Sequence, residues 1–175
     1  MVTRAIADEE TLPDINDFSI TVLQNNNVQL SWNKYADFTD GTEIAAGNYT
    51  LKATYGNIEI QGFGAPYYEG VKEFSIKENE STSRSVICYL ANVKVTTEYT
   101  ELFKKYFTDY TVNIRPAGST DISFGKNETR AAYVKPGKIS IYLSGSKQQG
   151  NKVTFEAATI ENAKARQHYR LKFDV

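Results

Sequence analysis

The sequence is poor in the residues that build thiol and metal chemistry, because it has one cysteine, Cys88, and one histidine, His168. A single cysteine excludes an internal disulfide, and Cys88 stands in an alternating run with Val86 and Leu90, a setting typical of a buried structural thiol. A thiol nucleophile needs a base beside it, and His168 belongs to a different strand pattern far along the chain. The pair gives little support for a thiol enzyme.

Concentrated positive charge is also missing, since 20 Lys and Arg are scattered among 21 Asp and Glu. Nucleic-acid binding depends on clustered positive charge, so no nucleic-acid partner is expected. No apolar run approaches the roughly 20 residues that span a bilayer. Residues 1–14 read as a flexible, polar lead-in, in which Met1 suggests that an export signal was removed and a start residue added. An alternating run that reaches Val175 suggests a fragment cut at a domain edge.

Apolar side chains at every second position are abundant, and this pattern is typical of half-buried β-strands. Phe18, Ile20 and Val22 alternate before the triplet Asn25–Asn27, which tolerates left-handed backbone and predicts a hairpin turn. Because regular helical crossovers are absent, the pattern predicts an all-β protein with an antiparallel β-sandwich, immunoglobulin-like or transthyretin-like. Further strands are expected around residues 28–32, 49–55, 74–76, 110–114, 139–143, 153–155 and 169–175.

Two segments depart from simple alternation. Between Val86 and Val95 the apolar parity changes, which indicates a bulge or bend near Ala91-Asn92. One short helix is expected after Thr100, a plausible N-cap, to pack over an edge or end of a sandwich. Its aromatic and apolar side chains recur at steps of three and four: Tyr99, Leu102, Phe103, Tyr106, Phe107 and Tyr110.

A faint repeat suggests two halves. A glycine opens an alternating strand at Gly47 and again at Gly137, 90 positions later. We therefore expect a first β-sandwich domain over 15–96 and a second over 97–175, following the lead-in 1–14. One larger sandwich is the alternative, because a glycine before a strand occurs in any β protein.

No constellation predicts an enzyme. No pair of carboxylates stands out for glycoside hydrolysis, and the sequence has no phosphate loop, serine nucleophile elbow or Cys/His cluster. We expect no catalytic residue and no cofactor. Asp37, Asp40 and Glu43 are closely spaced oxygen ligands that could hold calcium, but their spacing is not that of an EF-hand, and a turn between strands uses the same residues. The turn is favoured.

Aromatic side chains raise the question of sugar binding, since an exposed ring can stack on a pyranose. The aromatic residues concerned are Trp32, Tyr35, Phe38, Tyr67 and Tyr68. Trp32 shares the parity of Leu30 and is expected in the core. Tyr67 and Tyr68 are the better ligand-binding candidates, because they lie between Pro66 and Gly70 in an expected loop; a structural corner is the alternative.

Five phrases of strand and turn residues stand out: AGNYTLKATYG (46–56), GFGAPYYEGVKEFSI (62–76), VICYLANVKV (86–95), YTELFKKYFTDYTV (99–112) and IENAKARQHYRLKFDV (160–175). Together they resemble an uncharacterised surface-lipoprotein family of gut Bacteroides, a group with a domain of unknown function that is similar to fimbrillin-like proteins. The resemblance covers most of residues 15–175, and its strand and turn signatures say little about chemistry.

The resemblance implies export, a lipid-anchored N-terminus upstream of Met1, placement at the outer membrane or cell surface, and a two-part sandwich. Partners would be other surface or fimbrial subunits that pair through β-strands, or glycans, with the membrane reached only through the anchor. The expected function is a non-enzymatic structural or adhesive surface protein. The alternative is a carbohydrate-binding module of a glycan-handling surface system.

Overall fold

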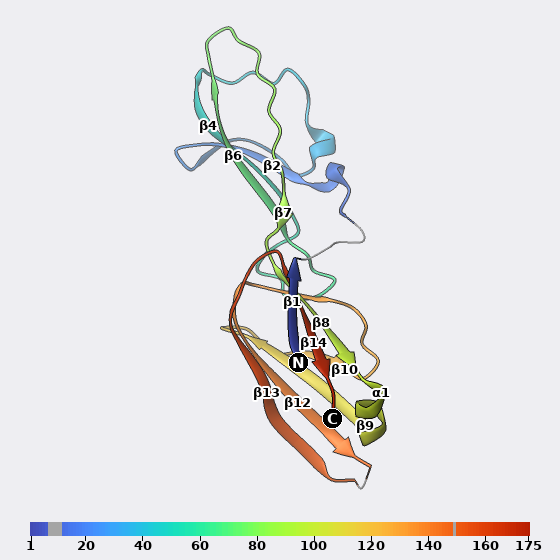
Figure 1. The fold of residues 1–175 in the computed structure, drawn as a ribbon. Helices are drawn as coiled ribbons and strands as arrows, with labels where there is room; N and C mark the ends of the chain where they lie inside the picture. Colours follow the sequence, from blue (N-terminus) through green and yellow to red (C-terminus); the bar gives the residue numbers. More distant parts are fainter. Residues whose placement is uncertain (7–11, 149) are drawn as a thin grey trace. The chain divides into compact units, whose positions relative to one another are not determined.

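A computed structural model describes residues 1–6, 12–148 and 150–175. The described residues divide into two compact units. The sandwich unit comprises 1–6, 57–66, 91–148 and 150–175, and the single-sheet unit comprises 12–56 and 67–90. Each unit is described by itself. Strands dominate both units, and Figure 1 labels most of them, so the expected all-β sandwich class is confirmed.

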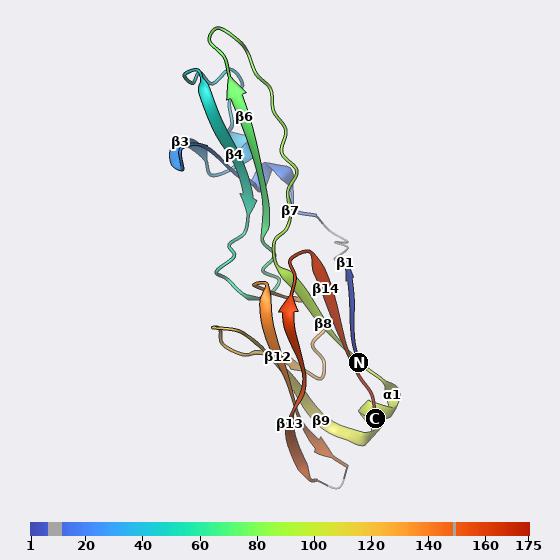
Figure 2. The same ribbon diagram turned by 60° about the vertical axis from the view of Figure 1, so that its left-hand side comes forward.

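The sandwich unit is built from two sheets (Figures 1 and 2). The first has the order β1-β14-β8-β11-β5, with β1 Val2–Ile6, β14 Gln167–Phe173, β8 Val93–Tyr99, β11 Ala132–Val134 and β5 Gly62–Phe63. The second has the order β10-β9-β12-β13, with β10 Ile122–Gly125, β9 Phe107–Pro116, β12 Gly137–Lys147 and β13 Lys152–Ala163.

The first sheet joins the two ends of the chain. β14 pairs antiparallel with β1 on one side and parallel with β8 on the other, the one departure from the expected antiparallel pairing among the described strands. Met1 donates its amino group to the Lys172 carbonyl at 2.6 Å and accepts from the Lys172 amide at 2.8 Å. Residues 2–6 therefore form a strand rather than a flexible lead-in. Of the remaining residues of the expected lead-in 1–14, residues 7–11 lie outside the described residues.

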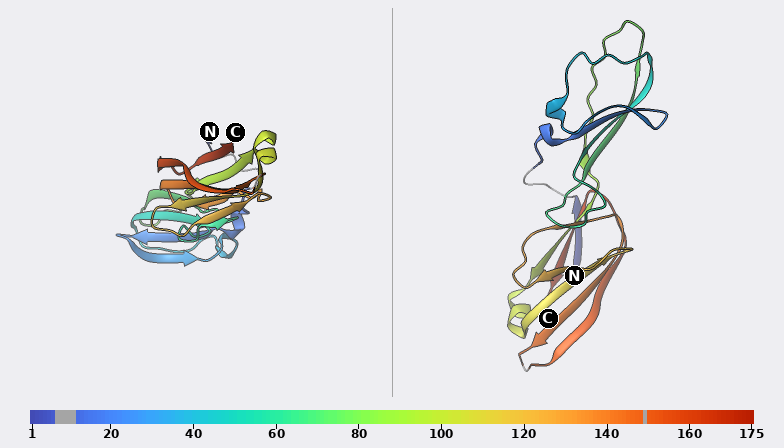
Figure 3. Two further views of the ribbon diagram at one scale, coloured as in Figure 1. Left: turned by 90° about the horizontal axis from the view of Figure 1, so that it is seen from below. Right: turned by 180° about the vertical axis from the view of Figure 1, so that it is seen from behind.

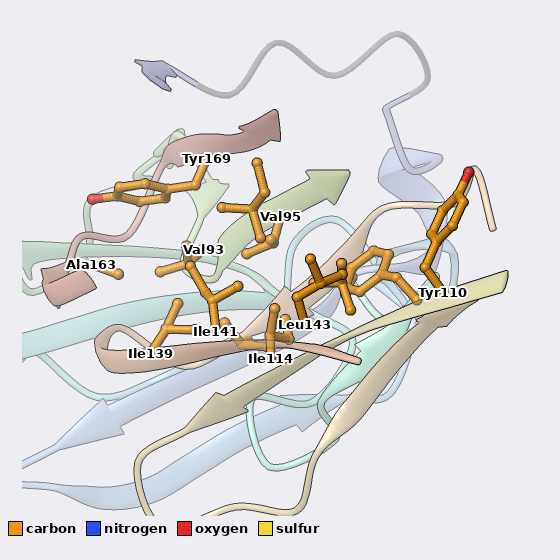
Figure 4. Packing of buried hydrophobic residues seen from close by; sticks show 14 of the residues in the cluster. Val93, Val95, Tyr110, Ile114, Ile139, Ile141, Leu143, Ala163 and Tyr169 are labelled. Carbon is orange, nitrogen blue, oxygen red and sulfur yellow. The ribbon is translucent and has the colours of Figure 1, made fainter. Parts of the chain in front are cut away.

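The core of the sandwich unit lies between its two sheets. Figure 4 shows Val93 and Val95 of the first sheet pointing toward Ile141 and Leu143 of the second. Val93 and Val95 are fully buried, and Leu143 is 2% exposed. Side chains of alternating positions thus fill one continuous interior, as the period-2 pattern predicts.

The helix α1, Glu101–Tyr106, lies beside the start of β9 (Figure 3). Thr100 is its N-cap as predicted, and its hydroxyl accepts from the Phe103 amide at 3.2 Å. The helix is shorter than the aromatic stripe suggested, because the chain turns extended at Phe107. Phe103 is 1% exposed whereas Leu102 is 64% exposed, so only part of the stripe packs inward.

The single-sheet unit contains one five-stranded sheet in the order β3-β2-β4-β6-β7. Asn25 and Asn26 have positive φ angles of 50° and 64°, which confirms the predicted hairpin turn between β2 and β3. The elements are η1 Ile15–Asp17, β2 Ser19–Gln24, β3 Asn27–Trp32, η2 Tyr35–Asp37, β4 Gly47–Tyr55, β6 Tyr68–Ile76 and β7 Tyr89–Leu90.

The bounds of the units differ from the contiguous division into 15–96 and 97–175. β1, β5 and β8 come from the N-terminal part of the chain, yet they hydrogen-bond into the sheet that contains β14. The change of parity near Ala91-Asn92 marks the passage from β7 in one sheet to β8 in another. The strands of the single-sheet unit form one sheet among the described residues, whereas the first β-sandwich domain was expected over 15–96.

Candidate functional site

An open cleft of about 370 Å³ lies at one side of the sandwich unit, which we name the edge cleft. It is flanked by two edge strands: β1 at one edge of the first sheet and β13 at one edge of the second. Its floor is apolar and buried: Phe103, Phe107, Ile141, Leu143 and Leu171. Its sides include Val2, Val153, Phe155, Phe173 and Val175.

Strand pairing shows that the sides of the edge cleft face the same interior as the core. Phe155 of β13 stands opposite Leu143 of β12, so both side chains point to one face, yet Phe155 is 48% exposed and Leu143 only 2%. Val2 of β1 stands opposite Leu171 of β14, with exposures of 40% and 1%. Side chains on this face are thus buried on β12 and β14 but about half exposed on the neighbouring edge strands β13 and β1. The core of the sandwich is therefore open to solvent between β1 and β13.

β13 combines this apolar face with an open edge. It is 12 residues long, and in the described sheet it pairs only with β12. The outward backbone groups of such an edge are a template for another strand. Polar residues lie at the rim of the edge cleft: Lys147, Lys172 and Asp174.

The C-terminal rim is fixed by hydrogen bonds. The Thr100 hydroxyl donates to Asp174 Oδ1 at 2.7 Å, and the Val175 amide donates to the same oxygen at 3.0 Å. These bonds, with Thr100 first, lower the pKa of Asp174. The N-cap of α1 thereby anchors the chain end that borders the edge cleft, so this side of the cleft is preorganised.

The three carboxylates of the loop 36–43 lie at the surface. Asp37, Asp40 and Glu43 are all exposed. In the part of the chain that the structure describes, no three His, Cys, Asp or Glu side chains gather as a metal ion would require. Gly41 has a φ of +79°, as the favoured interpretation of a turn requires.

Tyr67 and Tyr68 are buried, with exposures of 9% and 5%. The Tyr67 hydroxyl donates to Glu69 Oε2 at 2.5 Å, and that carboxylate also receives Lys52 Nζ at 2.8 Å. Burial, followed by the hydrogen bond to Glu69, raises the pKa of Tyr67. Tyr68 begins β6 instead of standing in a loop, and its ring packs against Phe18. Neither ring presents an open face for stacking.

Among the other aromatic candidates, Tyr35 is 42% exposed, whereas Trp32 and Phe38 are half-buried. Tyr35 stacks on Phe38 with ring centres 6.0 Å apart and planes at 14°, and Trp32 meets Phe38 edge-on at 5.0 Å. Trp32 is half-buried rather than enclosed in a core. We name these three side chains the ring cluster.

Cys88 and His168 belong to different compact units. Burial, and then the charge of Glu69, raises the pKa of Cys88, whose Sγ lies 3.7 Å from the Ala53 carbonyl oxygen. The thiol is therefore held protonated, which is the reverse of an activated nucleophile. His168 is 8% exposed and contacts the Thr96 hydroxyl at 2.8 Å.

Sequence reasoning missed the edge cleft. The alternation in β13 and β14 assigns Phe155 and Leu171 to inward faces, but it carries no information on which strand ends a sheet. Residues 2–6 show no clear alternation that would predict β1, because the charged Arg4 stands between Val2 and Ile6.

Within the described ranges, no helix is both long and apolar enough to cross a membrane. No curated protein matches the chain. Among solved structures, the chain is similar to a proposed cell adhesion protein from Bacteroides thetaiotaomicron, with 14% identity, a TM-score of 0.48, and coverage of 92% of this chain and 81% of that one. A proposed adhesin from Bacteroides ovatus is similar at 12% identity and a TM-score of 0.43, with 85% and 69% covered.

The family assignment rests on a match that spans the whole chain. A family model described as "Domain of unknown function (DUF4493)" matches residues 1–175. The chain therefore belongs to the DUF4493 family.

Proposed function

We propose that the protein is a non-enzymatic structural or adhesive protein of the cell surface, and that it associates with other surface subunits by accepting an extended segment along β13. The observation that carries this proposal is the edge cleft beside the open edge of β13. An added strand would hydrogen-bond to the free edge and place alternate side chains in the cleft.

The exposures fit an extended segment better than a compact ligand. The apolar sides of the cleft run along two strands, β1 and β13, and Phe155 and Val2 are each about half exposed although they point inward. A segment that pairs with β13 would lie beside Phe155 as β13 lies beside Leu143, and its side chains would bury the Phe155 ring. Burial of apolar area at about 25 cal/mol per Å² would favour this association, in addition to the backbone hydrogen bonds.

Natural edge strands are usually protected against such pairing by charged side chains, by proline, by a β-bulge or by a covering loop. β13 has no proline, and its inward positions near the cleft are Val153, Phe155 and Ala158. A bulge in its pairing, between Ile141 and Tyr142 of β12, is one such protection, but the pairing from Glu156 to Lys152 is regular. This regular part of the edge, beside the cleft, is thus left suited to a partner.

Site-specific photo-crosslinking in the native organism tests the proposal. A benzoylphenylalanine at Phe155 is expected to form crosslinks with an extended segment of a second surface protein or a second copy, identified by mass spectrometry. Benzoylphenylalanine at Leu102 is the matched control, because Leu102 is 64% exposed but lies on the helix α1, which offers no strand edge. Phe155→Lys is expected to abolish association by placing a charge in the cleft.

Three results would count against the proposal. Crosslinks from position 155 no more frequent than those from position 102 would exclude pairing at β13. Unchanged association in a correctly folded Phe155→Lys variant would do the same. Resistance to protease in intact cells, with digestion only after lysis, would exclude the cell surface.

A further inference from the structure

A second surface, in the single-sheet unit, has the chemistry of a binding site. We propose that the ring cluster of Trp32, Tyr35 and Phe38 binds a neutral glycan, with Tyr35 as the main stacking platform. This site is independent of strand pairing at β13, so either proposal can fail alone.

The first argument is exposure. Tyr35 is 42% exposed and lies beside the half-buried rings of Trp32 and Phe38, so three aromatic side chains gather at one surface. A pyranose has an apolar face of C–H groups that packs against an aromatic ring, while its hydroxyls remain available at the rim. Ligand sites commonly combine aromatic surfaces with a small number of polar groups in this way.

The second argument is rigidity. The Tyr35 amide donates to the Phe18 carbonyl at 2.6 Å, and Lys34 Nζ lies 2.7 Å from Asp17 Oδ1, so η2 is tied to η1. Figure 3, in its right-hand view, shows the two short coils side by side. The Phe38 amide also donates to the Tyr35 carbonyl at 3.0 Å. A platform already held in place costs little conformational entropy on binding.

The third argument is charge, which decides the class of glycan. Residues 33–43 contain three carboxylates, Asp37, Asp40 and Glu43, against one cation, Lys34, which already pairs with Asp17. Carboxylates accept hydrogen bonds from sugar hydroxyls. They repel sulfate, carboxylate and phosphate groups on an anionic glycan. The ligand is therefore expected to be uncharged.

Affinity gel electrophoresis of the whole chain tests the proposal, with β-glucan, xylan and α-mannan as neutral probes and heparin as the anionic one. At least one neutral polysaccharide is expected to retard the protein, and heparin is not. Tyr35→Ala should weaken binding by about tenfold, the loss of roughly one stacking contact of about 1.4 kcal/mol. Tyr35→Phe keeps the ring and should retain binding.

Tyr106→Ala is the matched control, because Tyr106 is 41% exposed but lies on α1 in the other unit. It should leave the affinity within about twofold of the wild type, a change below 0.5 kcal/mol. Circular dichroism melting establishes that each variant is folded. Lack of retardation by every neutral probe, retardation by heparin alone, or equal binding by folded Tyr35→Ala and wild type would overturn the proposal.

Discussion

Removing the ring of Phe103 should strongly destabilise the sandwich unit. Phe103 is 1% exposed and is the one buried residue of α1. Its ring lies 4.7 Å from that of Phe107, 5.1 Å from that of Tyr110 and 5.9 Å from that of Phe173. It therefore joins the helix to β9 and β14, and it also forms part of the floor of the edge cleft.

The magnitude follows from this burial. Replacing a buried phenylalanine by alanine costs about 3–5 kcal/mol, because transfer free energy is lost and a cavity remains. With a urea slope of about 2 kcal/mol per M, a loss of about 4 kcal/mol lowers the unfolding midpoint by about 2 M. Total stabilities of about 5–15 kcal/mol leave a folded but weakened variant in most of that range.

Leu102→Ala is the internal control, since Leu102 precedes Phe103 on the same helix and is 64% exposed. Its effect should stay within about 0.5 kcal/mol. Urea denaturation followed by far-ultraviolet circular dichroism measures both variants. If Phe103→Ala costs less than about 1 kcal/mol, or no more than Leu102→Ala, the helix does not pack as described.

Two further predictions concern other parts of the chain. Gly70→Ala should destabilise by roughly 1–3 kcal/mol in chemical denaturation, because a Cβ there would lie 2.5 Å from the Ile87 carbonyl oxygen. Gly125→Ala is the control and should be near neutral, because a Cβ there would have nothing within 4 Å. Equal effects of the two substitutions would contradict the packing of β6. Burial, then the charges of Lys94 and Arg170, lowers the pKa of His168 from 6.5 to about 4. Between these pH values the unfolded chain binds a proton at His168 that the folded chain does not bind, so the free energy of unfolding should decrease as the pH falls from about 6.5 to about 4. The decrease should be smaller in a His168→Gln variant. An NMR titration that places the imidazole pKa at or above 6.5 would refute this.

Local features of the fold were predictable because short-range rules govern them. Alternation located most strands, asparagines predicted the β2–β3 turn, and Thr100 was identified as the cap of α1. The extent of the helix was not predictable from its aromatic stripe. Phe107 and Tyr110 keep a helical spacing from Phe103, but pairing of β9 with β12 draws both into a strand.

The candidate sites were less predictable because exposure depends on distant segments. Tyr67 and Tyr68 looked like loop residues between Pro66 and Gly70, yet Tyr68 opens β6 and both rings are buried. Trp32 shares the parity of core residues but stands on β3, the last strand of its sheet, where cover is incomplete. Local sequence gives the direction of a side chain, and it does not give the element that lies over it.

The sequence by itself determined that this chain is all-β, where its hairpin turns, and which side chains point inward, because alternation, backbone preference and capping act between neighbours. Only the tertiary structure decided that β14 lies between β1 and β8, that β13 ends its sheet, and that Phe155 is left half exposed beside a cleft. Those outcomes depend on hydrogen bonds between strands far apart in the chain. Many pairings satisfy the same alternation, so the choice among them is made by the packing of the whole unit.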